Sequence, residues 1–306
     1  MAKEGIAALL ALGAALCVAV GDVLQQRAAH RITDTDRTNL QLFAKLVANR
    51  RWRWGALLLI ASIGLQAAAL DEGSVLLVQA LLVLSLLFAL PISARLSNRA
   101  LTRREWIWAI VLTAAVTVIV TVGNPQAGHS RPSLQAWVPV VAVLGPLLLG
   151  CLIAARIRGG AVAAVLFAFV SGSLWGVFAV LTKQVVTQLH DGPMAATRSP
   201  QLYAWILVAL GGFAWEQSAF RAGALTASMP TLEISQPVVA AVLGILVLGE
   251  TLNTGPAGMA VLAVAALAMT AATAALARGD AKATCRGVTA TPRRASPVAA
   301  AGRPRR

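Results

Sequence analysis

Ionisable and amide side chains interrupt several apolar stretches of this chain, and they are its best candidates for chemistry. Asp22, Glu216 and Glu233 each lie in a segment that is otherwise rich in aliphatic residues. A carboxylate inside a bilayer is costly and usually faces a cavity or a partner group. Glutamines accompany these acids, and the set predicts a pathway for a solute or an ion: Asp22, Gln25, Gln26, Gln66, Gln79, Glu216, Gln217, Glu233 and Gln236.

The segment from Ser228 to Glu250 combines an acid with helix-breaking residues. At helical spacing, Pro230, Glu233, Pro237 and Gly244 fall on one stripe, which should face protein or water and not lipid. Prolines also free backbone carbonyls that a pathway can use. We therefore expect the two prolines and Gly244 to line a cavity beside Glu233. A structural polar contact between helices is the alternative.

The composition indicates a polytopic, all-α membrane protein. Of 306 residues, 58% are hydrophobic and only 12% are charged, with a formal net charge of +14. The basic residues fall in loops and in the C-terminal tail, which favours membrane topology and contact with lipid over nucleic-acid binding. The sequence contains no nucleotide-binding loop, metal-protease pattern or nucleophile with an obvious base. We expect no enzymatic activity, no cofactor and a transport process driven by gradients.

Nine segments are long and apolar enough to cross a membrane: Ile6–Ala29, Trp54–Leu70, Val75–Ala94, Glu105–Val122, Trp137–Ala155, Ala161–Val185, Leu202–Phe220, Ser228–Glu250 and Ala257–Ala277. A shift of 151 positions places the first four on the last four. Residues 1–130 and 159–277 then form two four-helix repeats, and the helix within 131–158 links and inverts them. Inverted repeats are typical of secondary transporters. We expect residues 278–306 to be a disordered basic tail.

Basic residues also predict the orientation. The loops after the first, third, fifth and seventh spans and the tail are rich in arginine, whereas the other side has only Lys3, Arg131 and Arg198. The positive-inside rule places the N-terminus outside the cell membrane and the tail in the cytoplasm. Small-residue stripes on several spans can serve a homodimer as readily as packing within one chain.

Short motifs resemble those of a transporter superfamily. Leu248-Gly249-Glu250, followed by Leu252 and Gly258, resembles the signature that closes each repeat in the EamA-like proteins of the drug/metabolite transporter superfamily. The run from Gly21 to Arg27 is similar to the start of its NIPA-like branch, which also has nine spans. The resemblance implies a helical transporter with a central cavity and, for the NIPA-like branch, transport of Mg²⁺ or another divalent cation. The sequence departs from the pattern at Arg99, which stands where the first repeat should match Glu250.

Three functions remain open from the sequence. The first is a carrier of a small metabolite or drug, with Glu233 the first choice to carry a coupling proton. The second is a Mg²⁺ transporter that uses Asp22, Glu216 and Glu233 as ligands. The third is a membrane scaffold whose polar residues only pair with one another. For Glu250, a cap or a turn is as good an interpretation as transport, and we expect Lys183 to extend to the membrane interface.

Overall fold

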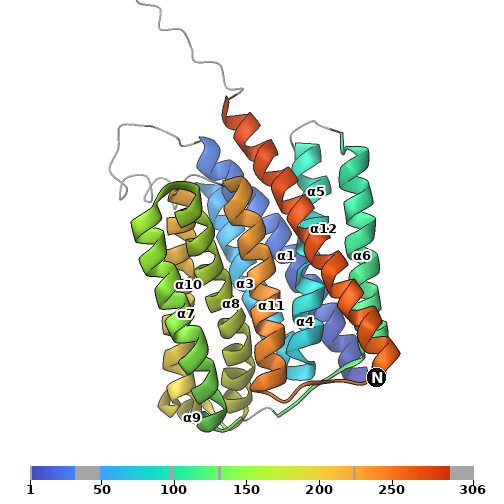
Figure 1. Cartoon of the computed structure of the whole chain (residues 1–306), viewed down its shortest axis with the longest axis vertical. Helices are drawn as coiled ribbons and strands as arrows, with labels where there is room; N and C mark the ends of the chain where they lie inside the picture. Colours follow the sequence, from blue (N-terminus) through green and yellow to red (C-terminus); the bar gives the residue numbers. More distant parts are fainter. Residues whose placement is uncertain (1, 32–48, 97–99, 130–131, 223–224, 290–306) are drawn as a thin grey trace, which may run out of the picture.

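The computed structural model describes residues 2–31, 49–96, 100–129, 132–222 and 225–289, leaving out the side chains of residues 2, 25–31, 225–226 and 280–289. The described part is a bundle of long helices that run up and down along one common direction (Figure 1). The helices are α1 (Ala2–Arg31), α3 (Arg50–Glu72), α4 (Val75–Leu82), α5 (Ser85–Leu96), α6 (Arg103–Gly123), α7 (Val138–Arg158), α8 (Gly160–His190), α9 (Pro193–Arg198), α10 (Pro200–Arg221), α11 (Leu225–Leu246) and α12 (Pro256–Thr289).

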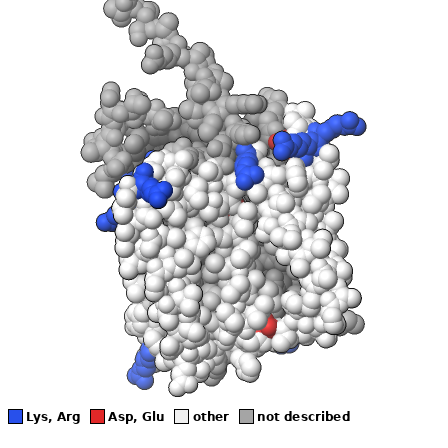
Figure 2. Space-filling view, in the orientation of Figure 1, with Lys and Arg blue, Asp and Glu red and all other residues white. Residues whose placement is uncertain are grey.

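The bundle has the dimensions and composition of a membrane protein. Among the described residues, eight helical segments are long and apolar enough to cross a membrane. The middle of the face shown in Figure 2 carries almost no charge, and lysine and arginine gather at its ends. The all-α, polytopic class is therefore confirmed. Helix α10 is not among the eight segments, because Glu216 and Gln217 lower the hydropathy of its second half.

Local sequence explains where several helices begin. Asn49 accepts a hydrogen bond from the backbone of Arg51 at the start of α3, and Ser199 accepts one from Leu202 at the start of α10. Thr102 and Glu105 cap each other reciprocally at the start of α6. Between α7 and α8, Gly159 and Gly160 have φ angles of 61° and 57°, which other residues rarely adopt. These signals fix the chain reversals between helices.

Three boundaries differ from the sequence prediction. The third span is divided at Val83 and Leu84 into α4 and α5, although the prediction was one continuous segment. Helix α11 ends at Leu246, before Glu250, because Gly249 has a φ of 64° and the chain turns there. Helix α12 continues past Ala277 to Thr289, so the start of the expected disordered tail is helical. Residues 290–306 of that tail, like Arg99, lie outside the described residues.

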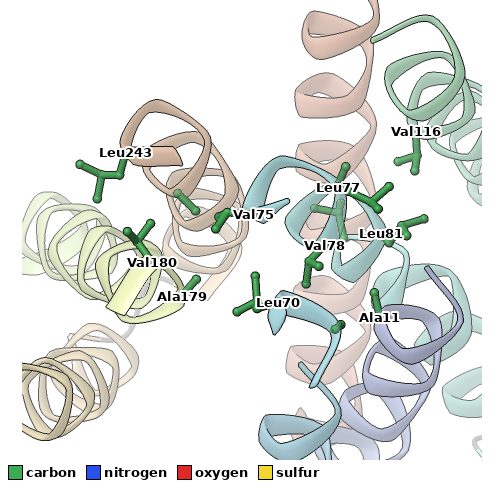
Figure 3. Packing of buried hydrophobic residues seen from close by; sticks show 14 of the residues in the cluster. Ala11, Leu70, Val75, Leu77, Val78, Leu81, Val116, Ala179, Val180 and Leu243 are labelled. Carbon is green, nitrogen blue, oxygen red and sulfur yellow. The ribbon is translucent and has the colours of Figure 1, made fainter. Parts of the chain in front are cut away.

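Contacts between helices join the early and the late part of the chain. Helix α1 packs on α3, α4 and α5, and α8 packs on α10 and α11, while α6 packs on α12 and α4 packs on α11. The core lies along these contacts. In Figure 3, Ala179 of α8 faces Leu70 of α3, and Val180 of α8 points toward Leu243 of α11. The end of α3 is thus buried against α8.

A two-residue β-ladder closes one end of the bundle. Strand β1 (Pro125–Gln126) follows α6 and pairs antiparallel with β2 (Thr251–Leu252), which precedes α12. The backbone N–H of His129 donates to the carbonyl of Leu248 in the same region. The connection after α6 is therefore fastened to the turn between α11 and α12.

Candidate functional site

A buried ion pair lies where the two halves of the chain meet. The Nζ atom of Lys183, on α8, is 3.4 Å from Oε1 of Glu250, and the two side chains are 3% and 0% exposed. Lys183 also donates a hydrogen bond of 2.6 Å to the carbonyl of Gly73, at the C-terminal end of α3. The ammonium group thus neutralises both an acid and the negative end of a helix. Helix α8 continues for seven residues beyond Lys183, so the pair is set back from the end of this helix.

Glu250 caps α4, the helix that follows Gly73 in the chain. Its Oε1 accepts a hydrogen bond of 2.6 Å from the backbone N–H of Val75, and its Oε2 accepts one of 3.0 Å from Leu76. These are two of the N–H groups that α4 cannot satisfy by itself, and a carboxylate also complements the positive end of the helix. Ser74 serves a third, because its hydroxyl oxygen accepts from the backbone of Leu77. The cap that the sequence offered for Glu250 is therefore present.

Gly244 owes its place to this cap. A Cβ atom added at residue 244 would lie 2.9 Å from Oε2 of Glu250, closer than real Cβ atoms come. Glycine lets α11 approach the carboxylate, so Gly244 lies against the ion pair. The sequence had placed it in a cavity beside Glu233.

The prediction for Lys183 was wrong. Its side chain does not extend to the interface but is enclosed between the carbonyl of Gly73 and the carboxylate of Glu250. An ammonium group can be buried when it has an opposite charge and hydrogen-bond acceptors around it. The partners are 110 and 67 positions away in the sequence. Spacing along one helix could not reveal them, although the occurrence of a lysine in the sixth predicted span and of an acid at the end of the eighth was a weak signal.

Glu216 is held at the interface between α8 and α10. Its Oε2 accepts a hydrogen bond of 3.0 Å from the indole Nε1 of Trp175. The indole ring lies against Gly212, where an added Cβ would be 3.3 Å from the ring. The hydroxyl of Ser171 donates to the carbonyl of Gly212 over 2.8 Å. Small residues on α10 therefore make room for Trp175, which positions the carboxylate.

Aromatic side chains continue this interface toward the α9 end of the bundle. Trp175 and Phe178 meet edge to face with ring centroids 5.3 Å apart, and Phe178 stacks on Trp205 at 5.0 Å. The indole N–H of Trp205 then donates to the hydroxyl of Thr182 over 2.9 Å. A row of aromatic and polar groups thus runs from Glu216 to Thr182.

The other predicted positions on α11 face its neighbours. Pro230 and Pro237 are buried, and Glu233 and Gln236 are half-buried. Helix α11 continues through both prolines without a break. Helix α8 approaches this region closely, because a Cβ added at Gly176 would lie 2.8 Å from the carbonyl oxygen of Gln236.

The remaining predicted positions are dispersed. Asp22 is exposed on α1, and Gln66 on α3 and Gln217 on α10 are half-buried. Gln79 is 2% exposed on α4, and its Nε2 has no hydrogen-bond partner among the described residues. Gln25 and Gln26 belong to α1, but their side chains lie outside the described part. Within that part, no three His, Cys, Asp or Glu residues form a group that could hold a metal ion, so Asp22, Glu216 and Glu233 are not brought together as one.

A comparison with curated proteins finds a relative that is similar over most of the chain. An uncharacterized protein of Corynebacterium glutamicum is 36% identical over 251 residues, which cover 82% of this chain and 87% of the relative. No protein-family model and no solved structure matches the chain. The relative thus carries the similarity along nearly its whole length, and its printed description assigns it no activity.

Proposed function

The chain belongs to the same family as this uncharacterized Corynebacterium glutamicum protein, and we propose that it is a secondary transporter driven by an ion gradient. It moves a small organic solute across the cell membrane and couples that movement to a proton or another cation through a carboxylate inside the membrane. The Lys183–Glu250 pair, which joins the two halves of the chain, is the observation that carries the transporter proposal, and the coupling carboxylate is sought among other side chains.

The energetics of the pair favour a functional role. Taking two charges out of water costs on the order of several kcal/mol per ion. Hydrophobic residues of similar volume often stabilise a fold as well as a buried ion pair does, or better. Stability alone is therefore a weak reason to keep such a pair. Lys183 and Glu250, in the second half of the chain, hold the turn before Val75 in the first half. A contact that joins two halves and can break is what alternating access requires.

The pattern of helix contacts supports two inverted repeats. In the first half α1 packs on α3 and on the α4–α5 pair, and in the second half α8 packs on α10 and on α11. The remaining helix of each half, α6 or α12, packs against the other. Helix α7 stands between the two sets in the sequence and packs on α8. The division of the third span into α4 and α5 adds a discontinuous helix, which is a further feature of such transporters.

The charged ends of the bundle favour the orientation that the sequence predicts. Figure 2 shows basic side chains mostly at the end from which α12 leaves the bundle in Figure 1. The described basic residues at that end are Arg50, Arg51, Arg53, Arg95, Arg103, Arg104, Arg156, Arg158, Arg221 and Arg278. Lys3 and Arg198 belong to the opposite end. We place the first end in the cytoplasm and the N-terminus outside.

Glu216 joins Glu233 as a candidate for the coupling carboxylate. Its oxygen is held by Trp175 at an interface that is otherwise small and aromatic. A carboxylate in such a place can take up and release a proton as the surrounding helices move. Glu250 is a poorer candidate, because both of its oxygens are already engaged by α4.

Flux into proteoliposomes tests the proposal. The purified protein is reconstituted into liposomes, and an inward proton gradient is imposed across their membrane. A pH dye trapped inside reports proton movement. Amino acids and the cationic dye ethidium are offered as solutes. We expect proton movement that depends on one added solute and falls to the background of empty liposomes in Glu216→Gln or Glu233→Gln. Glu72→Gln is the matched control, because Glu72 lies in a largely exposed pair with Lys3 at the bundle end.

The same liposomes distinguish the alternatives. Saturable Mg²⁺ entry without any organic solute would replace the proposal by Mg²⁺ transport. Equal proton movement in wild type and in both carboxylate variants would refute coupling through these side chains. If neither gradient drives any flux with any solute, the scaffold interpretation takes first place.

A further inference from the structure

An apolar cavity of about 420 Å³ adjoins the site described above and shares Thr182 and Trp205 with it. Helix α8 contributes its floor, from Thr182 to Leu189, and α3 and α10 contribute its walls, while the short helix α9 closes it toward the bundle end. At about 1.5 Å per residue the floor is roughly 10 Å long. Ile63 and Gly64 on the α3 wall are exposed, so the cavity opens on the side of the bundle. That side faces hydrocarbon when the apolar helices span a membrane.

The lining offers no polar atom to an occupant, even though it contains hydroxyl groups and an indole. Trp205 donates its N–H to Thr182, and Thr182 donates its hydroxyl to the carbonyl of Phe178. The hydroxyl of Thr197 donates to the carbonyl of Met194. Each polar group is thus engaged within the protein. A hydrated cation or a polar solute would find no partner here, and apolar cavities of this kind stay dry and take apolar ligands.

Polar groups stand at the closed end of the cavity. Arg198 is exposed and follows directly on Thr197, which lines the cavity. His190 follows on Leu189, another lining residue, and its Nε2 is 3.3 Å from Oδ2 of Asp71. An apolar slot that ends at a helix carrying an exposed arginine matches a molecule with an apolar chain and an anionic head.

We infer that this cavity binds an anionic phospholipid from the surrounding bilayer. One acyl chain lies along α8 between α3 and α10 and contacts the Trp205 ring. The phosphate lies at the bundle end, where Arg198 donates to its oxygens. This lipid site is independent of the transport proposal, because it uses none of Glu216, Glu233 or the Lys183–Glu250 pair.

Two substitutions address the two parts of the lipid. Gly64 lines the cavity and a Cβ added there meets nothing within 4 Å, so Gly64→Leu is chosen to place an apolar side chain at the cavity wall. Gly150→Leu is its control, because Gly150 on α7 also has nothing within 4 Å and lies away from the cavity. Arg198→Gln removes the cation at the closed end. Arg158→Gln removes an exposed arginine at the opposite end of the bundle.

Native mass spectrometry of the purified full chain measures the retained lipid, with phosphatidylglycerol as the probe and phosphatidylcholine as the neutral comparison. We expect wild type and both control variants to retain phosphatidylglycerol in preference to phosphatidylcholine. Gly64→Leu should weaken retention of both lipids by about tenfold or more, since the side chain displaces two or three buried methylene groups. Arg198→Gln should remove only the preference for phosphatidylglycerol.

Unchanged phosphatidylglycerol retention in Gly64→Leu would overturn the acyl-chain site. Equal retention of the two lipids by wild type would overturn the headgroup contact. Arg198 is exposed, so its variant stays informative even if Gly64→Leu does not fold. Loss of lipid in Gly64→Leu without any solute-dependent proton movement in wild type would support this inference alone. Normal lipid retention in Gly64→Leu, together with solute-dependent proton movement in wild type, would support only the transport proposal.

Discussion

Glu250→Ala is expected to lower the free energy of unfolding by about 3–5 kcal/mol, the usual cost of breaking a buried ion pair by removing one partner. The substitution leaves the Lys183 ammonium with the carbonyl of Gly73 as its remaining described acceptor, and it removes the cap from Val75 and Leu76. Lys183→Met should cost less, because the carboxylate keeps both backbone N–H donors. Reversible unfolding by sodium dodecyl sulfate in mixed micelles measures the free energy of unfolding of wild type and of the two variants.

The pair between Lys3 and Glu72 supplies the control. Its side chains are 82% and 32% exposed, and the Nζ–Oε2 distance is 3.7 Å. Glu72→Ala should change the free energy of unfolding by less than about 1 kcal/mol, as exposed pairs do. If Glu250→Ala is no more destabilising than Glu72→Ala, the buried pair and the cap do not hold the bundle end. Combining Glu250→Ala with Lys183→Met in a double-mutant cycle measures the coupling energy between these two side chains.

Gly176→Leu is expected to separate α8 from α11. A Cβ at this position would lie 2.8 Å from the carbonyl oxygen of Gln236 and 3.0 Å from the backbone nitrogen of Ala240. Backbone atoms cannot rotate away, so the helices themselves must move. Overpacking of this kind costs about 1–3 kcal/mol, and backbone contact favours the upper end of that range. The loss should appear as a lower unfolding free energy and a lower yield of monodisperse protein.

Gly145→Leu is the matched control for Gly176. It introduces the same side chain into the apolar helix α7, at a position with nothing within 4 Å. The variant should unfold like wild type. Wild-type stability in Gly176→Leu would mean that α8 and α11 are less closely packed than these distances require.

The long helices follow from the sequence because each is specified locally. An apolar run of about 20 residues, a cap such as Thr102 and a glycine such as Gly159 act within a few positions of one another. The break at Val83 does not follow in this way. Its residues are as apolar as their neighbours, and no proline or glycine marks the position. Periodicity along one segment therefore gives no sign of the division of that span.

The candidate site was harder to predict than the fold. The sequence could identify acids in apolar segments, and Glu216 is indeed held by an indole that it did not name. It missed Lys183, whose partners come from two other parts of the chain. The choice between an interfacial lysine and a buried one depends on whether an acceptor lies opposite, and only tertiary contacts supply that information.

The cap on α4 also has a consequence for biosynthesis. The carboxylate that binds the N–H of Val75 belongs to a residue made 175 positions later. At roughly 5–20 residues per second, the ribosome needs on the order of 10–35 s to supply it. During that interval the turn before α4 depends on water at the membrane surface or on the insertion machinery. Fragments that stop before Glu250 therefore lack the carboxylate that caps α4, and this end of the bundle is completed only after Glu250 has been translated.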